Sequence, residues 1–489
     1  MNDQPRRDRA DRHHPWWVWT LLAVSVAGVI FTYGPHLAHS TDDGFITYRY
    51  ARNLAEGHGL VFNPSERHLG TTAPGLAVLL GLLATVSSTA LIPLVSGALA
   101  LAALSGALAL LARRMRPDSW LLAFAVALGL SCNRWLVEVL GHEGFIVALL
   151  VLVALECVDV HRPTTSGVVW GLAVFIRPDS AVMGAVAGIE TWRRNRRFPL
   201  ALLVSVIVTT AVAALLLIWI AGSAIPFSLQ VKQAEAAAPV LAVGAPYWQT
   251  FGAWCQRTLG LGGLTLLGLG LWGWGRAAVR HDIRALAYLS PALAMVVFYP
   301  LVGVPFAPWY LVIPLLAVVA GAASTVTGLI ERGSVVSTIA ALALVAASVA
   351  PTAVWSTRLG FRPPDPRAEP MVEAASRIDD SALLEGSIAT VEVGFLGFAT
   401  RRPVLDLMGL GSPGALDAVT SSGVADFFLE RDPAFLVANP TFSYILDPLI
   451  TDPRFRSRYE PVFSVPPTDR YPKAVSVWQR VDDTSGPTP

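Results

Sequence analysis

Long apolar blocks, separated by short polar segments, dominate the pattern of this chain. Apolar runs of about 20 residues recur between Trp16 and Trp355, and a helix of that length crosses the ~30 Å hydrocarbon core of a bilayer. The first run has no small-residue cleavage site before Pro35, which favours a retained span over a signal peptide. The pattern predicts a polytopic α-helical membrane protein with about eleven spans.

The start and end of each apolar run predict the individual crossings. Residues 73–111 are long enough for two helices, yet they make only one net crossing if the basic cluster that follows lies inside. One piece of this segment would then be interfacial or re-entrant, and the pattern leaves open which. The other expected spans are residues 16–35, 120–135, 145–160, a split segment at 167–192, 200–221, 258–274, 286–304, 310–330 and 335–355.

From residue 357 onward the chain becomes proline-rich and charged. Residues 387–393 and 434–438 are short apolar or alternating runs bounded by glycine, proline and aspartate, a pattern typical of strands. The segment is long enough for one small α/β domain. We therefore expect three parts: a basic N-terminus at residues 1–15, a transmembrane domain at 16–356 with a long loop at 37–72, and a separate domain at 357–489.

Positive charge marks the cytoplasmic ends of membrane spans. Arginine clusters occur in the N-terminal segment, at residues 113–116, 193–197 and 276–284, and at Arg332. This distribution places the N-terminus inside and predicts that loop 37–72 and the C-terminal domain lie on the outer face. The net charge of +1 gives no indication of a nucleic-acid partner, and none is expected.

Composition narrows the class further. Charged residues make up only 15% of the chain, against about 25% in soluble domains, which excludes an ordinary soluble protein. Cys132, Cys157 and Cys255 lie in or beside apolar segments without the spacing of a disulfide framework or a zinc site. We predict no metal site and no cofactor.

The first outer loop carries two adjacent carboxylates, Asp42 and Asp43, at the start of an expected short surface helix. Helical spacing puts Arg49 two turns further on nearly the same face, and Gly57 and Gly59 end the helix. Either acid can cap the helix, and either can act as a base. If Asp42 is the cap, Asp43 is the freer side chain.

Four further polar elements fall on the predicted outer side: His142 with Glu143, Arg177 with Asp179, Lys232, and Trp309 with Tyr310. Each has a structural alternative. Arg177 either pairs with Asp179 or holds a phosphate, Lys232 either binds phosphate or extends to the membrane surface, and Trp309 and Tyr310 are typical of an aromatic belt. Because all four elements fall on the same side of the membrane, we expect them to form one functional site.

Acids and cations gathered at an outer membrane surface suggest group transfer from a phosphorylated lipid. A general base takes the proton of an acceptor hydroxyl, and cations stabilise the phosphate that leaves. A lipid-linked donor is the economical source of an activated sugar outside the cytoplasm. A divalent cation could bind the two aspartates, but arginine and lysine as phosphate partners need fewer assumptions.

The first loop, from Asp42-Asp-Gly-Phe-Ile-Thr-Tyr-Arg49 to Gly57-His-Gly59-Leu-Val-Phe-Asn63-Pro64 and Glu66-Arg67, resembles that of C-type (GT-C) glycosyltransferases that use polyprenyl-phosphate sugars. The nearest branch is that of the terminal arabinofuranosyltransferases of the cell wall. Weaker similarities extend over most of the chain, through the Gly141-x-Glu143, Arg177-Pro-Asp179 and Trp309-Tyr310 segments. The chain departs from the family pattern at residues 65–74 and at Gly144, which leaves the identity of the sugar open.

The resemblance implies an inverting transfer of a sugar, arabinofuranose in this branch, from a polyprenyl phosphate to a hydroxyl of an envelope glycan or lipid. It places the enzyme in a bacterial plasma membrane with its active site outside. A first-loop aspartate, Asp43 or Asp42, is the expected base. The remaining expected site residues are Arg177, Lys232 and Arg49 for the donor phosphate, and His58, Asn63, Glu66, His142, Glu143, Gln230, Trp309 and Tyr310 for substrate.

Two other classes compete with a glycosyltransferase. A transporter or flippase would show paired charges near the middle of the membrane and internal symmetry, and neither is visible in the sequence. A non-catalytic envelope assembly protein of the same fold is compatible with the sequence, because Asp42 and Asp43 could persist as helix caps.

Overall fold

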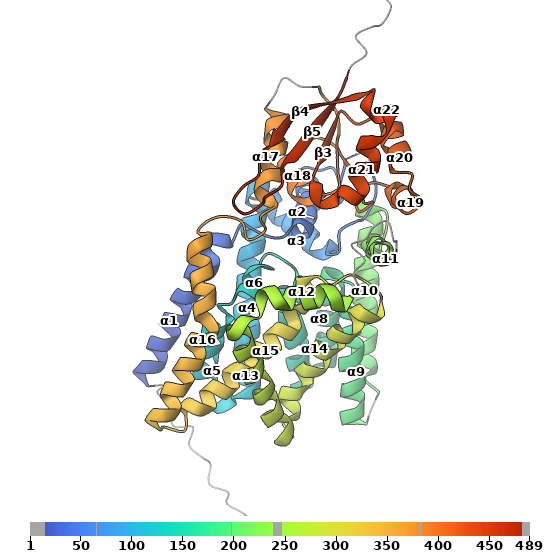
Figure 1. Ribbon diagram of the computed structural model, residues 1–489. Coiled ribbons are helices and arrows are strands. Elements are labelled where there is room, and N and C mark those ends of the chain that lie inside the picture. Colours follow the sequence, from blue (N-terminus) through green and yellow to red (C-terminus); the bar gives the residue numbers. More distant parts are fainter. Residues whose placement is uncertain (1–14, 65, 197, 238–246, 381–383, 482–489) are drawn as a thin grey trace, which may run out of the picture.

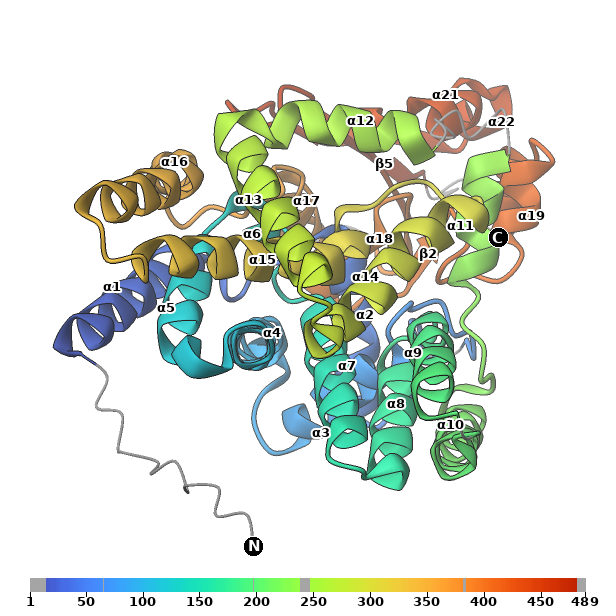
Figure 2. The ribbon, with the colours of Figure 1, turned by 90° about the horizontal axis from the view of Figure 1, so that it is seen from below.

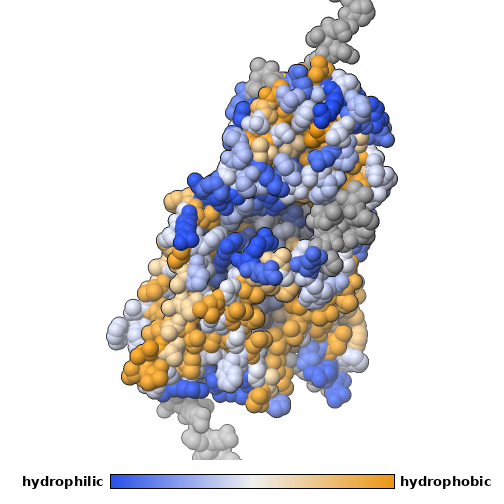
Figure 3. Space-filling model, in the orientation of Figure 1, coloured by the Kyte–Doolittle hydropathy of each residue, from blue (hydrophilic) through white to orange (hydrophobic). Residues whose placement is uncertain are grey.

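The protein has two parts stacked along one axis, a long helical body and a smaller α/β domain above it (Figure 1). The computed structural model describes residues 15–481 except 65, 197, 238–246 and 381–383. Apolar side chains gather on the visible face of the helical body, and hydrophilic ones on the upper domain and at the lower edge (Figure 3). This distribution is that of a body immersed in lipid with polar ends in water.

Within the described residues, six helical segments are long and apolar enough to cross a membrane. The chain is thus a multi-pass membrane protein, as the apolar blocks predict. The helices concerned are α1 (Trp16–Tyr33), α4 (Ile92–Met115), α10 (Leu200–Ala221), α14 (Ile283–Leu301), α15 (Val312–Ile330) and α16 (Val335–Leu359). The rest of the body contains α3 (Pro74–Thr85), α5 (Trp120–Ser131), α6 (Arg134–Val137), α7 (Gly144–Asp159), α8 (Pro163–Ile176), α9 (Ser180–Asn195) and α13 (Gly260–Val279).

The ambiguous segment 73–111 divides into two helices of unequal length. Helix α3 has 12 residues and is about 18 Å long, too short to cross the ~30 Å hydrocarbon core. Helix α4 has 24 residues and is the one that crosses. The predicted split at 167–192 is also present, because α8 and α9 meet at Arg177.

Three helices lie outside the main bundle direction. Helix α2 (Asp42–Ala55) lies between the body and the upper domain, and α11 (Ser228–Ala237) lies to its right and lower in Figure 1, at the top of the body. Helix α12 (Tyr247–Thr258) runs across the bundle, as Figures 1 and 2 both show. Gly57 follows α2 with a φ of 84°, the left-handed conformation that glycine adopts without strain, and α2 ends there as expected.

The C-terminal domain is a five-stranded mixed sheet in the order β2-β1-β3-β5-β4. Strand β1 (Ile388–Thr390) pairs in parallel with β2 (Val404–Asp406) and β3 (Phe435–Ala438), whereas β5 (Val475–Arg480) runs antiparallel to β3 and to β4 (Tyr459–Val465). The predicted strands at 387–393 and 434–438 correspond to β1 and β3. The helices of this domain are α17 (Ala368–Asp379), α18 (Val393–Ala399), α19 (Ala415–Thr420), α20 (Val424–Arg431), α21 (Ser443–Thr451) and α22 (Pro453–Arg456).

The first loop completes the core of this domain. Successive strand residues alternate between the two faces of the sheet, and Ile388 and Phe435 point to the face that α17 covers. The same buried cluster contains Tyr50, Phe62 and Leu69 from the segment before α3. Loop 37–72 and the C-terminal domain therefore share one hydrophobic core although more than 280 residues separate them in sequence.

Candidate active site

Asp42 binds the start of a helix in the other domain. Its carboxylate accepts hydrogen bonds from the backbone N–H groups of Gly394 at 3.1 Å and Phe395 at 2.8 Å, which open α18. A Cβ at Gly394 would collide with the Asp42 backbone, so this close approach requires glycine. Asp42 is only 9% exposed. It caps a helix, but α18 rather than the α2 that it begins.

Two arginines of α2 bind the opposite end of α18. Arg49 donates to the carbonyl oxygens of Gly397 at 2.5 Å and Arg402 at 2.9 Å, and Arg52 donates to those of Phe398 at 2.8 Å and Thr400 at 3.0 Å. An acid at the N-terminus and cations at the C-terminus both suit the dipole of α18. Helix α2 thus stabilises both ends of α18 and holds the two domains together.

This arrangement corrects the prediction that Arg49 binds the donor phosphate. Its Nε donates to the Phe62 carbonyl at 2.8 Å and its Nη2 to Asn63 Oδ1 at 3.1 Å, in addition to the bonds to α18. The side chain is 1% exposed and its guanidinium is surrounded by carbonyl oxygens. Helical spacing correctly predicted that Arg49 lies on the same face of α2 as Asp42. That face packs against α18 of the C-terminal domain and not against a ligand site.

Asp43 faces the helical body instead. Its carboxylate lies 3.7 Å from Nζ of Lys232 on α11, and about a fifth of each side chain is exposed. The two neighbouring acids, which the sequence could not separate, therefore differ in environment. Asp42 is buried in bonds to backbone N–H groups, and Asp43 is partly open beside a cation.

A cavity of about 310 Å³ opens next to this pair. Lys232 lines it on one side, and Arg177, Asp179, Tyr299 and Tyr310 line it on another. The remaining wall is largely apolar, with contributions from Ile225, Leu229, Phe298, Val302 and Val304. A few polar groups within an apolar cavity are typical of a site for a ligand that has a charged head and an apolar tail.

Arg177 is the centre of the polar wall. Its Nε donates to both carboxylate oxygens of Asp179 at 2.9 Å, its Nη1 to Glu143 at 2.7 Å, and its Nη2 to the Tyr299 hydroxyl at 2.7 Å. The Tyr299 hydroxyl in turn donates to Asp179. Burial raises the pKa of Glu143, but Arg177 and His142 outweigh it and lower that pKa to about 2, so Glu143 is ionised.

Aromatic side chains continue this wall toward α2. The rings of Tyr299 and Tyr310 are stacked with centroids 3.8 Å apart. The ring of His142 stacks on Trp309 at 5.0 Å, and its Nε2 lies 2.7 Å from the hydroxyl of Thr41, the residue before α2. The structure therefore brings together Asp43, His142, Glu143, Arg177, Lys232, Trp309 and Tyr310 from five segments far apart in sequence.

Four predicted substrate-binding residues lie elsewhere. Asn63 uses both ends of its amide on the backbone of Val404 and so ties the loop to strand β2. Glu66 accepts a hydrogen bond from Asn63 at 3.0 Å and pairs with Arg431 of α20 at 3.8 Å. His58 is exposed beyond the far end of α2, about 20 Å along the helix from Asp43. Gln230 is exposed on α11 about 200° around the helix from Lys232, since each residue turns by about 100°.

Some residues of the site give only a weak signal in the sequence. Tyr299 interrupts an apolar helix next to Pro300 and falls within an expected span.

Glu392 and Arg367 lie in the C-terminal domain, where Nη1 of Arg367 donates to Glu392 at 2.7 Å. Burial raises the pKa of Glu392 to about 8 and that of Asp42 to about 6. A buried acid cluster therefore underlies the first turn of α2.

This cluster predicts a pH dependence of stability. A carboxyl whose pKa is raised in the folded state contributes stability that is present at low pH and is lost as pH rises through the folded value. For Glu392 this loss extends from about pH 5 to above pH 8. The Glu392→Gln variant has no titrating proton at this position, so its stability does not fall in this way. The melting temperature of the variant minus that of the wild type should therefore rise by a few degrees from pH 5 to pH 8.

The comparison with the variant is needed because buried histidines act in the opposite direction. Burial lowers the pKa of His39 and of His68, so the wild type alone mixes both effects. Thermal unfolding of both proteins at four pH values between 5 and 8 measures the difference. A constant difference, or one that shrinks with pH, would contradict the prediction.

Comparisons with known proteins identify the fold but no closer relative. No protein-family model matches the chain, and no curated protein sequence does. Among solved structures, the chain is similar to ArnT from Cupriavidus metallidurans in the apo state, with a TM-score of 0.60 and 15% identity over 97% of this chain and 99% of that chain. It is also similar to ArnT from the same organism bound to undecaprenyl phosphate, with a TM-score of 0.52 and 16% identity over the same shares.

Both comparisons cover the helical body and the C-terminal domain together. The expected fold class, a polytopic GT-C-like helical protein with a small α/β C-terminal domain, is confirmed. At this level of identity the similarity concerns the fold and not the chemistry. The chain is a multi-pass membrane protein that has the fold of ArnT over nearly its whole length.

Proposed function

We propose that this protein is an inverting glycosyltransferase that moves a sugar from a polyprenyl phosphate to a hydroxyl acceptor. The observation that carries the proposal is the position of Asp43 beside Lys232, at a cavity that joins Arg177 to an apolar wall. An acid, two cations and an apolar wall are what such a donor and its reaction need. The fold shared with ArnT, which has been solved with undecaprenyl phosphate, supports the lipid phosphate.

In the proposed reaction Asp43 takes the proton of the acceptor hydroxyl. The hydroxyl oxygen forms a bond to the anomeric carbon from the side opposite the phosphate, and the bond from that carbon to the phosphate oxygen breaks. The electron pair of that bond stays on the phosphate oxygen, so the leaving group is the polyprenyl phosphate. Lys232 and Arg177 stabilise its developing charge, and the apolar wall with Ile225, Leu229 and Phe298 holds the first prenyl units.

Arg177 is already shared between Glu143 and Asp179. A phosphate that enters must therefore compete with these carboxylates, and Lys232 makes the first contact in this proposal. The two acids hold the guanidinium in place, and the Tyr299 hydroxyl fixes its plane. The stacked pair of His142 and Trp309 would cover the sugar from the side of α2.

We propose an outward orientation for this site, with the C-terminal domain outside the bacterial plasma membrane, because Arg116, Arg276, Arg280 and Arg332 lie at the other end of the body. Arabinofuranose is the first sugar to test because of the first-loop resemblance, and an envelope glycan or lipid is the proposed acceptor. The ArnT comparisons do not support one sugar over another.

The direct test incubates the purified protein with a panel of polyprenyl-phosphate sugars and with envelope glycan or lipid acceptors. Sugar-dependent formation of free polyprenyl phosphate and of a glycosylated acceptor supports the proposal. Parallel reactions with EDTA should retain full rate, because Lys232 and Arg177 supply the positive charge. If the protein consumes none of the donors but moves intact donor across vesicle membranes, the result would favour a flippase instead.

Lys232 offers a sharper prediction about the phosphate. The Lys232→Met variant keeps the aliphatic stem but removes the charge, so the KM for the donor should rise about tenfold, the effect of losing one charge-assisted hydrogen bond. Gln230→Met on the opposite face of α11 is the matched control and should leave the KM unchanged. Equal KM values for the Lys232→Met variant and the wild type would remove Lys232 from the phosphate site.

A further inference from the structure

Four arginines converge at the end of the helical body that lies opposite the C-terminal domain. Arg276 and Arg280 come from the last turn of α13 and the residue after it, Arg116 follows α4, and Arg332 follows α15. They line a cavity of about 430 Å³ together with Met115, Asp118, Gly328 and Glu331. Figure 2 views the molecule from this end, and Figure 3 shows hydrophilic side chains along the lower edge.

The guanidinium groups approach each other over Gly328. A Cβ built on this glycine would lie 3.5 Å from Nη1 of Arg116 and 3.6 Å from Nη1 of Arg276. The missing side chain leaves the space in which the two cations meet. Arg276 and Arg280 are also one helical turn apart and therefore point in the same direction.

The charges of this cavity are not balanced. Arg116 pairs with Glu331, but within the described ranges no carboxylate lies within the 4.0 Å of an ion pair from Arg276, Arg280 or Arg332. Four arginines and two carboxylates leave an excess of two positive charges. Burial and the neighbouring Arg276 and Arg280 lower the pKa of Arg116, which reflects the repulsion among these cations.

Membrane topology alone does not account for this arrangement. The positive-inside rule requires arginines near the ends of the spans, and exposed side chains such as Arg113 and Arg162 meet that requirement. It does not require several guanidinium groups to enter one cavity. Converging cations in excess of their carboxylate partners are typical of a site for an anion.

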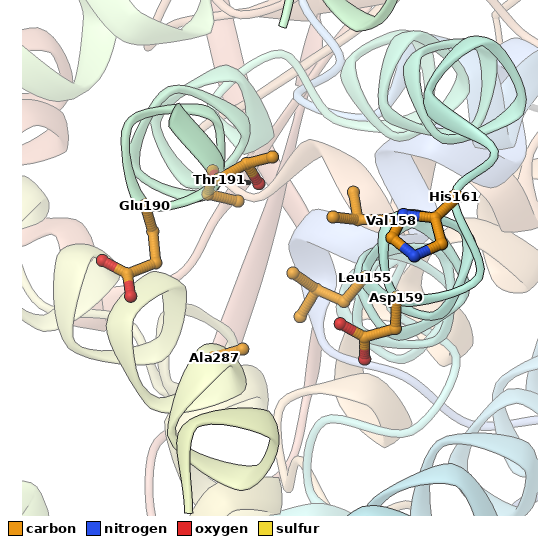
Figure 4. Close-up of a pocket in the computed structure, with 8 residues that line it drawn as sticks. Leu155, Val158, Asp159, His161, Glu190, Thr191 and Ala287 are labelled. Atoms are coloured by element: carbon orange, nitrogen blue, oxygen red, sulfur yellow. Dashed lines mark hydrogen bonds between the residues drawn. The ribbon is translucent and has the colours of Figure 1, made fainter. Parts of the chain in front are cut away.

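A second cavity at the same end provides a contrast (Figure 4). It measures about 210 Å³ and is lined by Asp159, His161 and Glu190 among others. Its carboxylates are already paired, since Asp159 binds Arg114 at 2.8 Å and Glu190 binds Arg193 at 3.0 Å. Of these two cavities, the arginine cavity is the one with unbalanced charge.

Exposed apolar side chains flank the arginines along α13. Trp272 precedes Arg276 by one helical turn on α13 and is 63% exposed, and Val279, next to Arg280, is 79% exposed. A free anion would gain nothing from these contacts, whereas the acyl chains of a lipid would lie along them. Basic cavities between helices at a membrane surface bind anionic lipid headgroups in this way.

We propose that this cavity binds the phosphate headgroup of an anionic membrane lipid in the leaflet opposite the C-terminal domain. Arg116 and Arg276 would hold the phosphate over Gly328, Arg280 would bind it from the adjacent turn, and the lipid chains would pack on Trp272 and Val279. The site is at the opposite end of the body from Asp43, so it is separate from the proposed sugar transfer.

The test measures binding of three soluble probes to the purified full-length protein in detergent. The probes are dihexanoyl phosphatidic acid, the zwitterionic dihexanoyl phosphatidylcholine, and inorganic phosphate. The wild type should bind phosphatidic acid saturably and at least about tenfold more tightly than either of the others. In the Arg276→Gln/Arg280→Gln variant the Kd for phosphatidic acid should rise at least about tenfold, since two charge-assisted contacts are lost.

Two further variants keep the result interpretable. The Arg113→Gln/Arg162→Gln variant removes the same charge from the same end outside the cavity and should keep the wild-type Kd within about twofold. The Gly328→Leu variant fills the cavity without changing its charge, favours the helix, and should weaken binding as well. Unsaturable binding to the wild type, or equal binding by the arginine variant, would overturn the proposal. Equal affinity for inorganic phosphate and phosphatidic acid would overturn its assignment to a lipid.

Discussion

Replacing Asp43 by asparagine is expected to lower the kcat of sugar transfer by at least about 100-fold, the contribution of a positioned general base. Asparagine has nearly the same shape but cannot accept the proton of the acceptor hydroxyl. The side chain is partly exposed and pairs with Lys232 at the rim of the cavity, so the variant should fold and insert normally. The rate of polyprenyl phosphate release by the purified variant measures the effect, with its melting temperature as the test of folding.

The adjacent acid provides the matched control. Asp42→Asn retains one carbonyl oxygen to accept from Gly394 or Phe395 and loses the second acceptor. We expect a loss of about 1 kcal/mol in stability with much of the transfer activity retained. This differs from the expectation from sequence alone, in which either acid could be the base. Wild-type rates for Asp43→Asn, with strong inactivation of Asp42→Asn, would reverse the assignment.

Replacing Arg177 by alanine is expected to raise the donor KM at least about tenfold and to destabilise the protein by about 3–5 kcal/mol. The second effect arises because Glu143 and Asp179 would remain in the site without their cation. Donor titration and thermal unfolding of the purified variant measure the two effects separately. An unchanged donor KM would restrict Arg177 to a structural role.

A double variant separates these roles. Arg177→Met together with Glu143→Gln removes the cation and one of its acids, so most of the lost stability should return. The donor KM should stay high, because the contact with the phosphate is still missing. If the double variant regains both stability and donor affinity, the effect of Arg177→Ala on the KM came from misfolding of the site.

The sequence predicted the class of the molecule well, because repeated apolar blocks near 20 residues match the thickness of a bilayer and are rare in soluble proteins. It also predicted that the polar residues of the candidate site lie on one side, because each lies next to the end of an expected span or, for Arg177, at the break within one. It could not separate Asp42 from Asp43. The difference depends on the N-terminus of α18, whose Gly394 lies 352 residues further along the chain.

The errors have the same origin. Arg49 and Asn63 are polar residues in a short loop of a membrane protein, a setting that favours a role in ligand binding. Their partners are backbone groups at Gly397 and Val404, and nothing in the local pattern indicates them. Similarly, the arginine clusters at 113–116 and 276–284 predicted orientation, but the sequence did not show that Arg116 and Arg276 meet over Gly328.

The double capping of α18 by α2 has a practical consequence for protein engineering. Because Asp42, Arg49 and Arg52 supply the end contacts of a helix in the C-terminal domain, that domain is incomplete when cut out at residue 357. Chimeras that exchange the C-terminal domain between proteins of this fold should therefore exchange residues 37–72 with it. Expression of the helical body alone would leave this loop without its cover and expose Tyr50 and Phe62 to solvent.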